Sequence, residues 1–210
     1  MTPSLVPPIN PALPLAPAAY SPMHQTQFAN ALRLYFNQLN SAVTTLLGVR
    51  GGQYLNAVYG SAYEDQSQTA ALVNTPYLVV LNRPGPSNGV AISGTNGFVV
   101  PVPGVYNYAF SIQFQNTDSN FHQAFVWLRV NNVAVPWSAS YISVPSKHGS
   151  TNGTTILAAN FLLELTANDQ VDLWWQTDDL GVSVHAIPAA GSIPGSPSVA
   201  ASLTYVSSLP

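Results

Sequence analysis

The 210-residue sequence predicts a mainly β protein, in which a two-sheet sandwich follows a proline-rich segment and one long helix. Three patterns predict this: prolines crowd the first 22 residues, apolar residues recur every three or four positions from 22 to 47, and short strand patterns follow residue 52. The clearest strand spans 104–114. Its every second residue is aromatic or branched, so one face is buried, and the predicted core comprises Tyr106, Tyr108, Phe110, Ile112 and Phe114.

Residues 1–21 are expected to form an extended arm, because proline fits neither a helix interior nor a central strand and favours a polyproline path. The apolar residues between the prolines are the predicted anchors on another protein: Leu5, Val6, Ile9, Leu13 and Leu15. The alternative is a disordered tail. Such tails usually carry more charge and less leucine than this segment, which favours a docked arm.

Residues 22–48 are predicted to form an oligomerisation helix, with Ser21 as N-cap, Pro22 in the first turn and Gly48 at the C-terminal cap. Its apolar residues follow heptad spacing, with steps of four and three, and define the predicted oligomer interface: Phe28, Leu32, Tyr35, Leu39, Ala42 and Leu46. The flanking Ala29, Phe36 and Val43 widen this stripe. The alternative is a single amphipathic helix that packs on its own domain.

The rest of the chain divides into a linker with the first strands (49–75) and a β head (76–210). Asn131-Asn132 suits a tight hairpin that tolerates positive φ, and 167–169 is a second turn. The predicted strands are 54–59, 77–81, 97–100, 104–114, 124–131, 140–144, 154–165, 170–176, 182–187 and 199–206. Short strands without helices between them predict a sandwich of Greek-key or jelly-roll type.

Composition narrows the classes of function. Only 6% of residues are charged, against roughly 25% in typical soluble proteins, which is typical of a chain that works inside an assembly. No cluster of Lys and Arg is present to neutralise phosphates, so we expect no nucleic-acid partner. Without a long apolar run we expect no membrane-spanning helix, and without cysteine there is neither a disulfide nor a thiol nucleophile.

Four stretches of the head resemble, in order and spacing, the globular heads of the complement-component and tumour-necrosis-factor-like superfamily. They are "FVVPVPGVYNYAFSIQF", "AFVWLRVNNVAV", "NFLLELTANDQVDLWW" and "SVAASLTYVS". Asp169 and Val171 match the family's Gly-Asp-x-Val turn, with Asn168 in place of the glycine; asparagine also tolerates the left-handed conformation. The resemblance covers about residues 76–207 and implies a ten-stranded jelly roll.

In that superfamily a collagen stalk or membrane anchor precedes the head, whereas here a proline arm and a heptad helix do. This arrangement resembles the jelly-roll structural proteins of tailed bacteriophages, as do "QFANALRLYFNQLNS", "GGQYLN" and "IQFQNTD". The resemblance implies a homotrimer located on the virion, with capsid or tail proteins as further partners. We expect no cofactor and no enzymatic activity, because no catalytic, metal or nucleotide motif is found in the sequence.

Candidate chemistry is sparse. The four histidines lie far apart in the sequence and form no metal motif; Asp118 and His122 could orient one another, but no nucleophile elbow accompanies them. Acidic residues at 169, 172, 178 and 179 suggest calcium without matching a calcium loop. Trp174 and Trp175 must face opposite sides of their strand, so one is predicted in the core and the other exposed.

Two functions remain from the sequence. The first is a structural role, a capsid decoration or fibre held by its arm and helix. The second is recognition of a host surface glycan or envelope protein as part of a tail fibre. The residues predicted to form the receptor loops are Asp118, Asn120, His122, Lys147, His148, Asp178 and Asp179.

Overall fold

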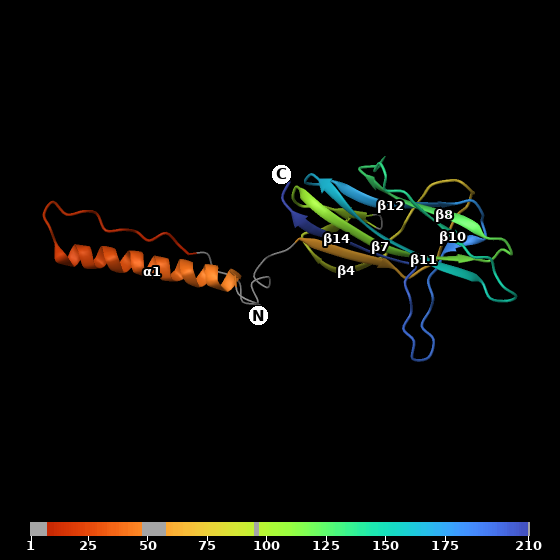
Figure 1. Cartoon of the computed structure of the whole chain (residues 1–210), viewed down its shortest axis with the longest axis horizontal. Helices are drawn as coiled ribbons and strands as arrows, with labels where there is room; N and C mark the ends of the chain where they lie inside the picture. Colours follow the sequence, from red (N-terminus) through yellow and green to blue (C-terminus); the bar gives the residue numbers. More distant parts are fainter. Residues whose placement is uncertain (1–7, 48–57, 95–96, 210) are drawn as a thin grey trace. The chain divides into compact units, whose positions relative to one another are not determined.

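The computed structural model describes residues 8–47, 58–94 and 97–209. The chain divides into two compact units, Met1–Asn56 and Ala57–Pro210 (Figure 1). The head thus begins before residue 76, because the strand at 59–64 pairs within its sheet. Over the described residues, no helix is both long enough and apolar enough to cross a membrane.

Helix α1 spans Pro22–Leu47, which confirms the predicted range. Ser21 is its N-cap: its Oγ accepts a hydrogen bond from the backbone N–H of His24 (3.3 Å), and its carbonyl accepts one from Gln25 (3.1 Å). The predicted C-terminal cap, Gly48, lies outside the described residues.

The described part of the arm runs back along α1 (Figure 1), with bends at residues 18 and 19 just before the helix. The Nε2 atom of His24 donates a hydrogen bond to the carbonyl of Pro14 (3.2 Å). Pro8, Pro11 and Pro14 are half-buried at every third position, the period of polyproline II, so one side of the arm faces the helix. The arm is extended as predicted, but it lies on its own helix.

The predicted interface and anchor residues differ in exposure. Along the heptad seam, Leu32, Tyr35, Leu39 and Ala42 are half-buried within this unit, whereas Phe28 and Leu46 each remain 37% exposed. Of the anchors, Leu5 and Val6 lie outside the described residues. The other three point away from the helix and are exposed: Ile9 (80%), Leu13 (44%) and Leu15 (93%).

The head is built from two antiparallel sheets, as the sandwich prediction requires. The first sheet is centred on β7 (Gly104–Asn116), which pairs along its whole length with β11 (Gly153–Leu165). Apart from β11, neighbouring strands of this sheet follow the order β2 (Gln68–Thr69), β13 (Val182–Val184), β7, β14 (Val199–Ser207), β1 (Tyr59–Glu64) and β4 (Arg83–Asn88).

The second sheet is centred on β12 (Gln170–Thr177) and β8 (His122–Val130). Two short strands extend it: β3 (Tyr77–Leu78) pairs with β12, and β9 (Val133–Ala134) pairs with β8. Its main order is β10 (Ser140–Val144), β8, β12, β6 (Gly97–Val99) and β5 (Ala91–Ile92).

The core lies between the sheets. The five alternate residues of β7 named above are at most 5% exposed, and their neighbours in sequence are only half-buried. From the opposite sheet, Trp175 is 1% exposed, and its ring centroid lies 6.1 Å from those of both Phe114 and Tyr77. The contact between Trp175 and Phe114 joins the two sheets, whereas Tyr77 is the neighbour of Trp175 within the second sheet.

The turns at Asn131-Asn132 and Asn168 follow the sequence prediction, whereas the edge strand β4 was not predicted. Asn131 and Asn132 both have positive φ (51° and 68°) between β8 and β9, and Asn168 has φ 71°. Strand β4 was not predicted, because Pro84 and Pro86 argue against a strand; it forms at the end of its sheet, where proline is tolerated. The predicted strand 54–59 lies largely outside the described residues.

A polar clasp joins the end of β1 to the start of β4. The Asp65 carboxylate accepts hydrogen bonds from Asn82 Nδ2 (2.9 Å) and Arg83 Nε (2.7 Å). These two donors, Asn82 foremost, lower the pKa of Asp65 to about 2. The clasp is solvent-exposed, so its contribution to the free energy of unfolding is small.

The first prediction concerns this clasp. A depressed carboxyl pKa contributes stability above the ordinary value of 3.8, and that contribution is lost as the pH falls toward about 2. We expect the wild-type protein to have a higher melting temperature than Asp65→Asn at pH 6, and the difference to shrink between pH 4 and pH 2. Thermal unfolding at a series of pH values measures it. A difference that stays constant across this window would contradict the assignment.

Candidate functional site

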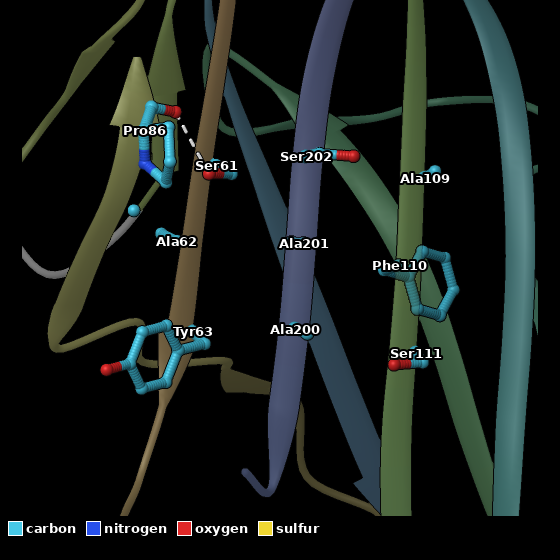
Figure 2. Close-up of a pocket in the computed structure, with 11 residues that line it drawn as sticks. Ser61, Ala62, Tyr63, Pro86, Ala109, Phe110, Ser111, Ala200, Ala201 and Ser202 are labelled. Atoms are coloured by element: carbon cyan, nitrogen blue, oxygen red, sulfur yellow. Dashed lines mark hydrogen bonds between the residues drawn. The ribbon is translucent and has the colours of Figure 1, made fainter.

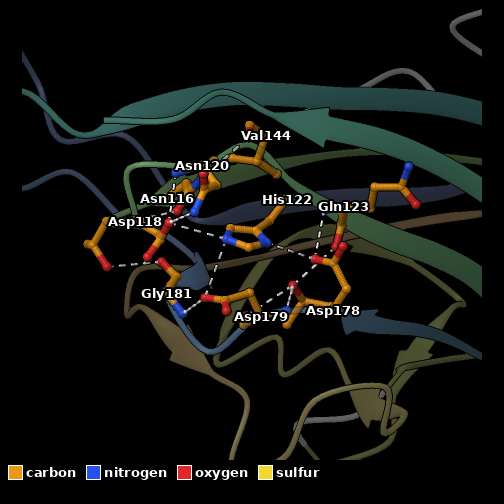
Figure 3. A network of polar contacts seen from close by, with 11 residues as sticks. Asn116, Asp118, Asn120, His122, Gln123, Val144, Asp178, Asp179 and Gly181 are labelled. Atoms are coloured by element: carbon orange, nitrogen blue, oxygen red, sulfur yellow. Dashed lines mark hydrogen bonds and ion pairs between the residues drawn. The ribbon is translucent and has the colours of Figure 1, made fainter. Parts of the chain in front are cut away.

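The predicted receptor-loop residues come from three loops that meet beside the start of β8 (Figure 3). Asp118 and Asn120 lie between β7 and β8, and Asp178 and Asp179 follow β12. The loop between β10 and β11 joins them through the backbone N–H of Lys147, which donates to the carbonyl of Asp118 (2.8 Å). The structure therefore gathers segments that are up to about 60 residues apart in sequence.

His122 lies at the centre of this cluster, and three carboxylates surround it (Figure 3). Its Nε2 is 3.5 Å from Asp118 Oδ1 and 3.8 Å from Asp179 Oδ1, and its Nδ1 is 3.5 Å from Asp178 Oδ1. The imidazole is 18% exposed and the carboxylates 37–40%. When the ring is protonated, it forms ion pairs that link two of the loops.

Backbone hydrogen bonds hold the carboxylates in place. Asn120 N–H donates to Asp118 Oδ1 (2.7 Å), and this bond, followed by the His122 contact, lowers the pKa of Asp118. Gln123 N–H donates to Asp178 Oδ1 (2.8 Å), and Gly181 N–H donates to Asp179 Oδ1 (2.7 Å). Main-chain hydrogen bonds therefore fix the positions of these three carboxylates.

Sequence reasoning missed Asn116, which organises the first loop. Asn116 is fully buried; its Nδ2 donates to the carbonyl of Asn120 (2.8 Å), and its Oδ1 accepts from the N–H of Asp118 (2.8 Å). The signal was present in "NTDSN", where Asn, Asp and Asn at steps of two are typical of successive side-chain-capped turns.

The suggested calcium cluster does not form. Asp169 and Asp172 lie at the start of β12 and Asp178 and Asp179 follow its end, and even Asp172 and Asp178 are about 20 Å apart at 3.3 Å per residue. Asp169 Oδ1 accepts from Asn131 Nδ2 (2.7 Å), which locks it into the hairpin. Among the described residues, no group of three or more histidine and acidic side chains is arranged to hold a metal ion.

A second surface lies on the outer face of the first sheet (Figure 2). A shallow groove there is lined by small side chains of β1, β14 and β7, among them Ser61, Ala109, Ser111, Ala200 and Ser202, and by Tyr63 and Pro86 at one side. None of its lining residues is charged. A flat uncharged floor of this kind suits contact with another flat surface.

The same face continues onto the neighbouring strand β11. Ile156 is 59% exposed and Leu162 is 66% exposed, because outward residues alternate with core residues along this strand. Asn160, between them on the outer face, contacts Asn107 of β7 (3.4 Å). The outer face of the first sheet therefore combines small, amide and aliphatic side chains, with the exposed carboxylate of Glu164 near the end of β11.

The tryptophans divide as predicted only in part. Trp175 is in the core, but Trp174 on the opposite face is half-buried, because the guanidinium of Arg129 lies 3.8 Å from its ring centroid. Arg129 is also the cross-strand neighbour of Asp172, whose pKa is raised by burial. Arg129 thus covers the indole that was predicted to be exposed.

The most exposed tryptophan is instead Trp137, at 98%. It follows Pro136 in the turn Val135–Ser138. The backbone N–H of Ser138 donates a hydrogen bond to the Val135 carbonyl (3.3 Å) and closes this turn. The buried Oγ of Ser138 accepts a hydrogen bond from the N–H of Leu128 (3.1 Å) and anchors the turn to β8. Trp137 has φ 63°, a value that glycine normally supplies after proline in such a turn. A bulky side chain in this conformation is strained.

No protein-family model matches the chain, and no curated protein matches it at a significant level. Arguments about function therefore rest on the strand order, the exposed surfaces and the loop cluster described above.

The second prediction concerns the turn at Trp137. Trp137→Gly removes the left-handed penalty, whereas Trp137→Ala retains it, and the indole contributes almost no packing because it is 98% exposed. We expect the glycine variant to exceed the alanine variant by about 1 kcal/mol in free energy of unfolding. Urea unfolding followed by circular dichroism measures this. Equal stability of the two variants would show that the turn is not strained.

Proposed function

We propose that this chain is a structural component of a phage virion, a homotrimeric decoration or fibre protein. The N-terminal arm and α1 attach it, and the head is displayed outward. Its work is assembly: apolar surface is buried at about 25 cal/mol per Å², repeated by symmetry, and no reaction is catalysed. The observation that carries the proposal is the uncharged groove on the outer face of the first sheet, together with the heptad pattern of α1.

We further propose that the head is a jelly roll of the tumour-necrosis-factor type. Ten of its strands are longer than two residues. Eight principal strands taken in chain order are β1, β6, β7, β8, β10, β11, β12 and β14. In one sheet the neighbour order is β1, β14, β7 and β11, which are the first, eighth, third and sixth of these strands. In the other sheet it is β6, β12, β8 and β10, which are the second, seventh, fourth and fifth. A chain that winds through two Greek keys produces this order, and it supports the expected head fold.

Self-association is supported by the composition of the exposed surfaces. Ile156 and Leu162 are exposed beside a groove without charged residues, and monomeric proteins rarely expose large contiguous apolar patches. With only 6% charged residues in the chain, little electrostatic repulsion opposes contact between copies. Three-fold symmetry would bury the same face of each copy.

Attachment through the arm is supported by the direction of its side chains. Its half-buried prolines face α1, so Ile9, Leu13 and Leu15 project to the other side. Exposed aliphatic side chains on an extended segment suit a groove of another virion protein. The helix and arm together therefore present an anchor that is separate from the head.

The third prediction tests the structural role. We expect the purified full-length protein to sediment with three times the mass of the single 22.3 kDa chain at micromolar concentration. We also expect a reconstruction of the virion that carries it to show three-fold knobs. A monomer at all accessible concentrations would contradict trimer formation. Absence of the chain from purified particles would contradict the virion assignment.

The loop cluster favours a second candidate function, recognition of a hydroxyl-rich host glycan by a tail fibre. Three loops converge there, and Asp118, Asp178 and Asp179 present partly exposed carboxylates, which accept hydrogen bonds from sugar hydroxyls. Lys147 and His148 are exposed beside them. Three linked copies would strengthen weak individual binding through effective concentration.

The fourth prediction tests recognition. If the cluster binds the host, purified protein should compete with virions for adsorption to host cells, and Lys147→Ala/His148→Ala should compete less well. Val133→Ser is the matched control, because Val133 is exposed in the hairpin at the other end of β8. Failure of the wild-type protein to compete would reject this second function and leave the structural role.

A further inference from the structure

Helix α1 carries two overlapping heptad series that share the same leucines. The first contains Phe28, Tyr35 and Ala42, as predicted from the sequence. The second contains Ala29, Phe36 and Val43 in their place, one position further along. With the shared residues it reads Ala29, Leu32, Phe36, Leu39, Val43 and Leu46, in steps of three and four throughout. The helix therefore has two apolar flanks on either side of a leucine row.

The two flanks differ in exposure. Tyr35 and Ala42, on the first flank, are half-buried. Phe36 is 59% exposed and Val43 is 43% exposed, although each is the immediate neighbour of a half-buried residue. Because successive helical residues are about 100° apart, the first flank faces a covering segment and the second faces solvent.

The covering segment is the arm. It meets the helix where Pro14 accepts a hydrogen bond from His24, which lies on the same side as Tyr35 and Ala42. From Pro14 back to Pro8 the arm extends about 19 Å at 3.1 Å per residue, which is the length of about twelve helical residues. The half-buried Pro8 thus reaches roughly the level of Tyr35. A partner helix cannot occupy this flank while the arm is there.

We propose that α1 associates with further copies of itself through the second series, while each arm stays on the first flank of its own helix. This rests on the proposed self-association and names its surface. The seam becomes Ala29, Leu32, Phe36, Leu39, Val43 and Leu46. Tyr35, which the sequence placed at the interface, instead lies under the arm, and Ala42 follows it on the same flank.

The occupant of the exposed flank is a second copy for two reasons. Positions 29, 36 and 43 and positions 32, 39 and 46 each recur at seven residues, and such a repeat keeps one stripe against a supercoiled partner helix. The strip has no charged side chain, so identical strips approach without repulsion. In a parallel arrangement, the arm of one copy would lie against Arg33 and Asn40 of the next copy. These two residues border the seam on the side opposite to the arm.

Cross-linking tests the seam directly, because the chain contains no cysteine. Val43→Cys and Ala42→Cys are adjacent matched variants of the full-length protein, and Phe36→Cys and Tyr35→Cys form a second pair. With a short bismaleimide, we expect Val43→Cys and Phe36→Cys to link copies at least about fivefold more efficiently than their partners, because central seam positions lie closest between copies. Equal or reversed efficiencies would overturn the proposal.

Substitution provides an independent readout. Phe36→Asn/Val43→Asn should raise the concentration at which the assembly dissociates by about 100-fold, and Tyr35→Asn/Ala42→Asn should change it less than about fivefold, as expected for side chains at the centre and the edge of an interface. If the wild-type protein never associates, the proposed function fails. If the wild-type protein associates and only Tyr35→Asn/Ala42→Asn dissociates the assembly, self-association stands and the proposed seam is wrong. If α1 packs on its own head, neither cysteine of a pair links copies, and the seam is rejected.

Discussion

Burial of one face of β7 between the two sheets is the interaction on which the head depends. Its alternate aromatic and branched residues meet Trp175 and its neighbours from β12, and its two edges pair with β11, β14 and β13. The same alternation sends Ala109 and Ser111 outward. One strand therefore contributes both to the core and to the uncharged groove that we propose contacts other copies.

Scarcity of charge is the second constraint, and it applies both to the head and to the N-terminal unit. The groove on the outer face of the first sheet and the exposed flank of α1 both lack charged residues. The charges that do occur are mostly used locally: Asp65 with Arg83, Asp172 with Arg129, and three carboxylates around His122. Such a chain has few means of keeping copies apart, which is consistent with a role in assembly.

Local patterns were readable from the sequence, and arrangements in space were not. The helix, its Ser21 cap, the alternation in β7 and the Asn131-Asn132 hairpin follow from residues close in sequence. Strand β4 was hidden by its prolines, and the cover of Arg129 over Trp174 depends on two strands meeting. The loops of the candidate site were identified, but their convergence on His122 requires the fold. The arm's position on α1 likewise depends on contacts between segments.

The central claim is that contact between copies, and not the packing within one chain, holds α1 in place. Hydrogen–deuterium exchange at several protein concentrations tests it most directly, because amides of α1 and of β7 are followed in the same sample. The account predicts that exchange in α1 slows as concentration rises through the association range, while exchange in the core of β7 stays unchanged. Exchange in α1 that is independent of concentration, in a protein that remains monomeric, would contradict it.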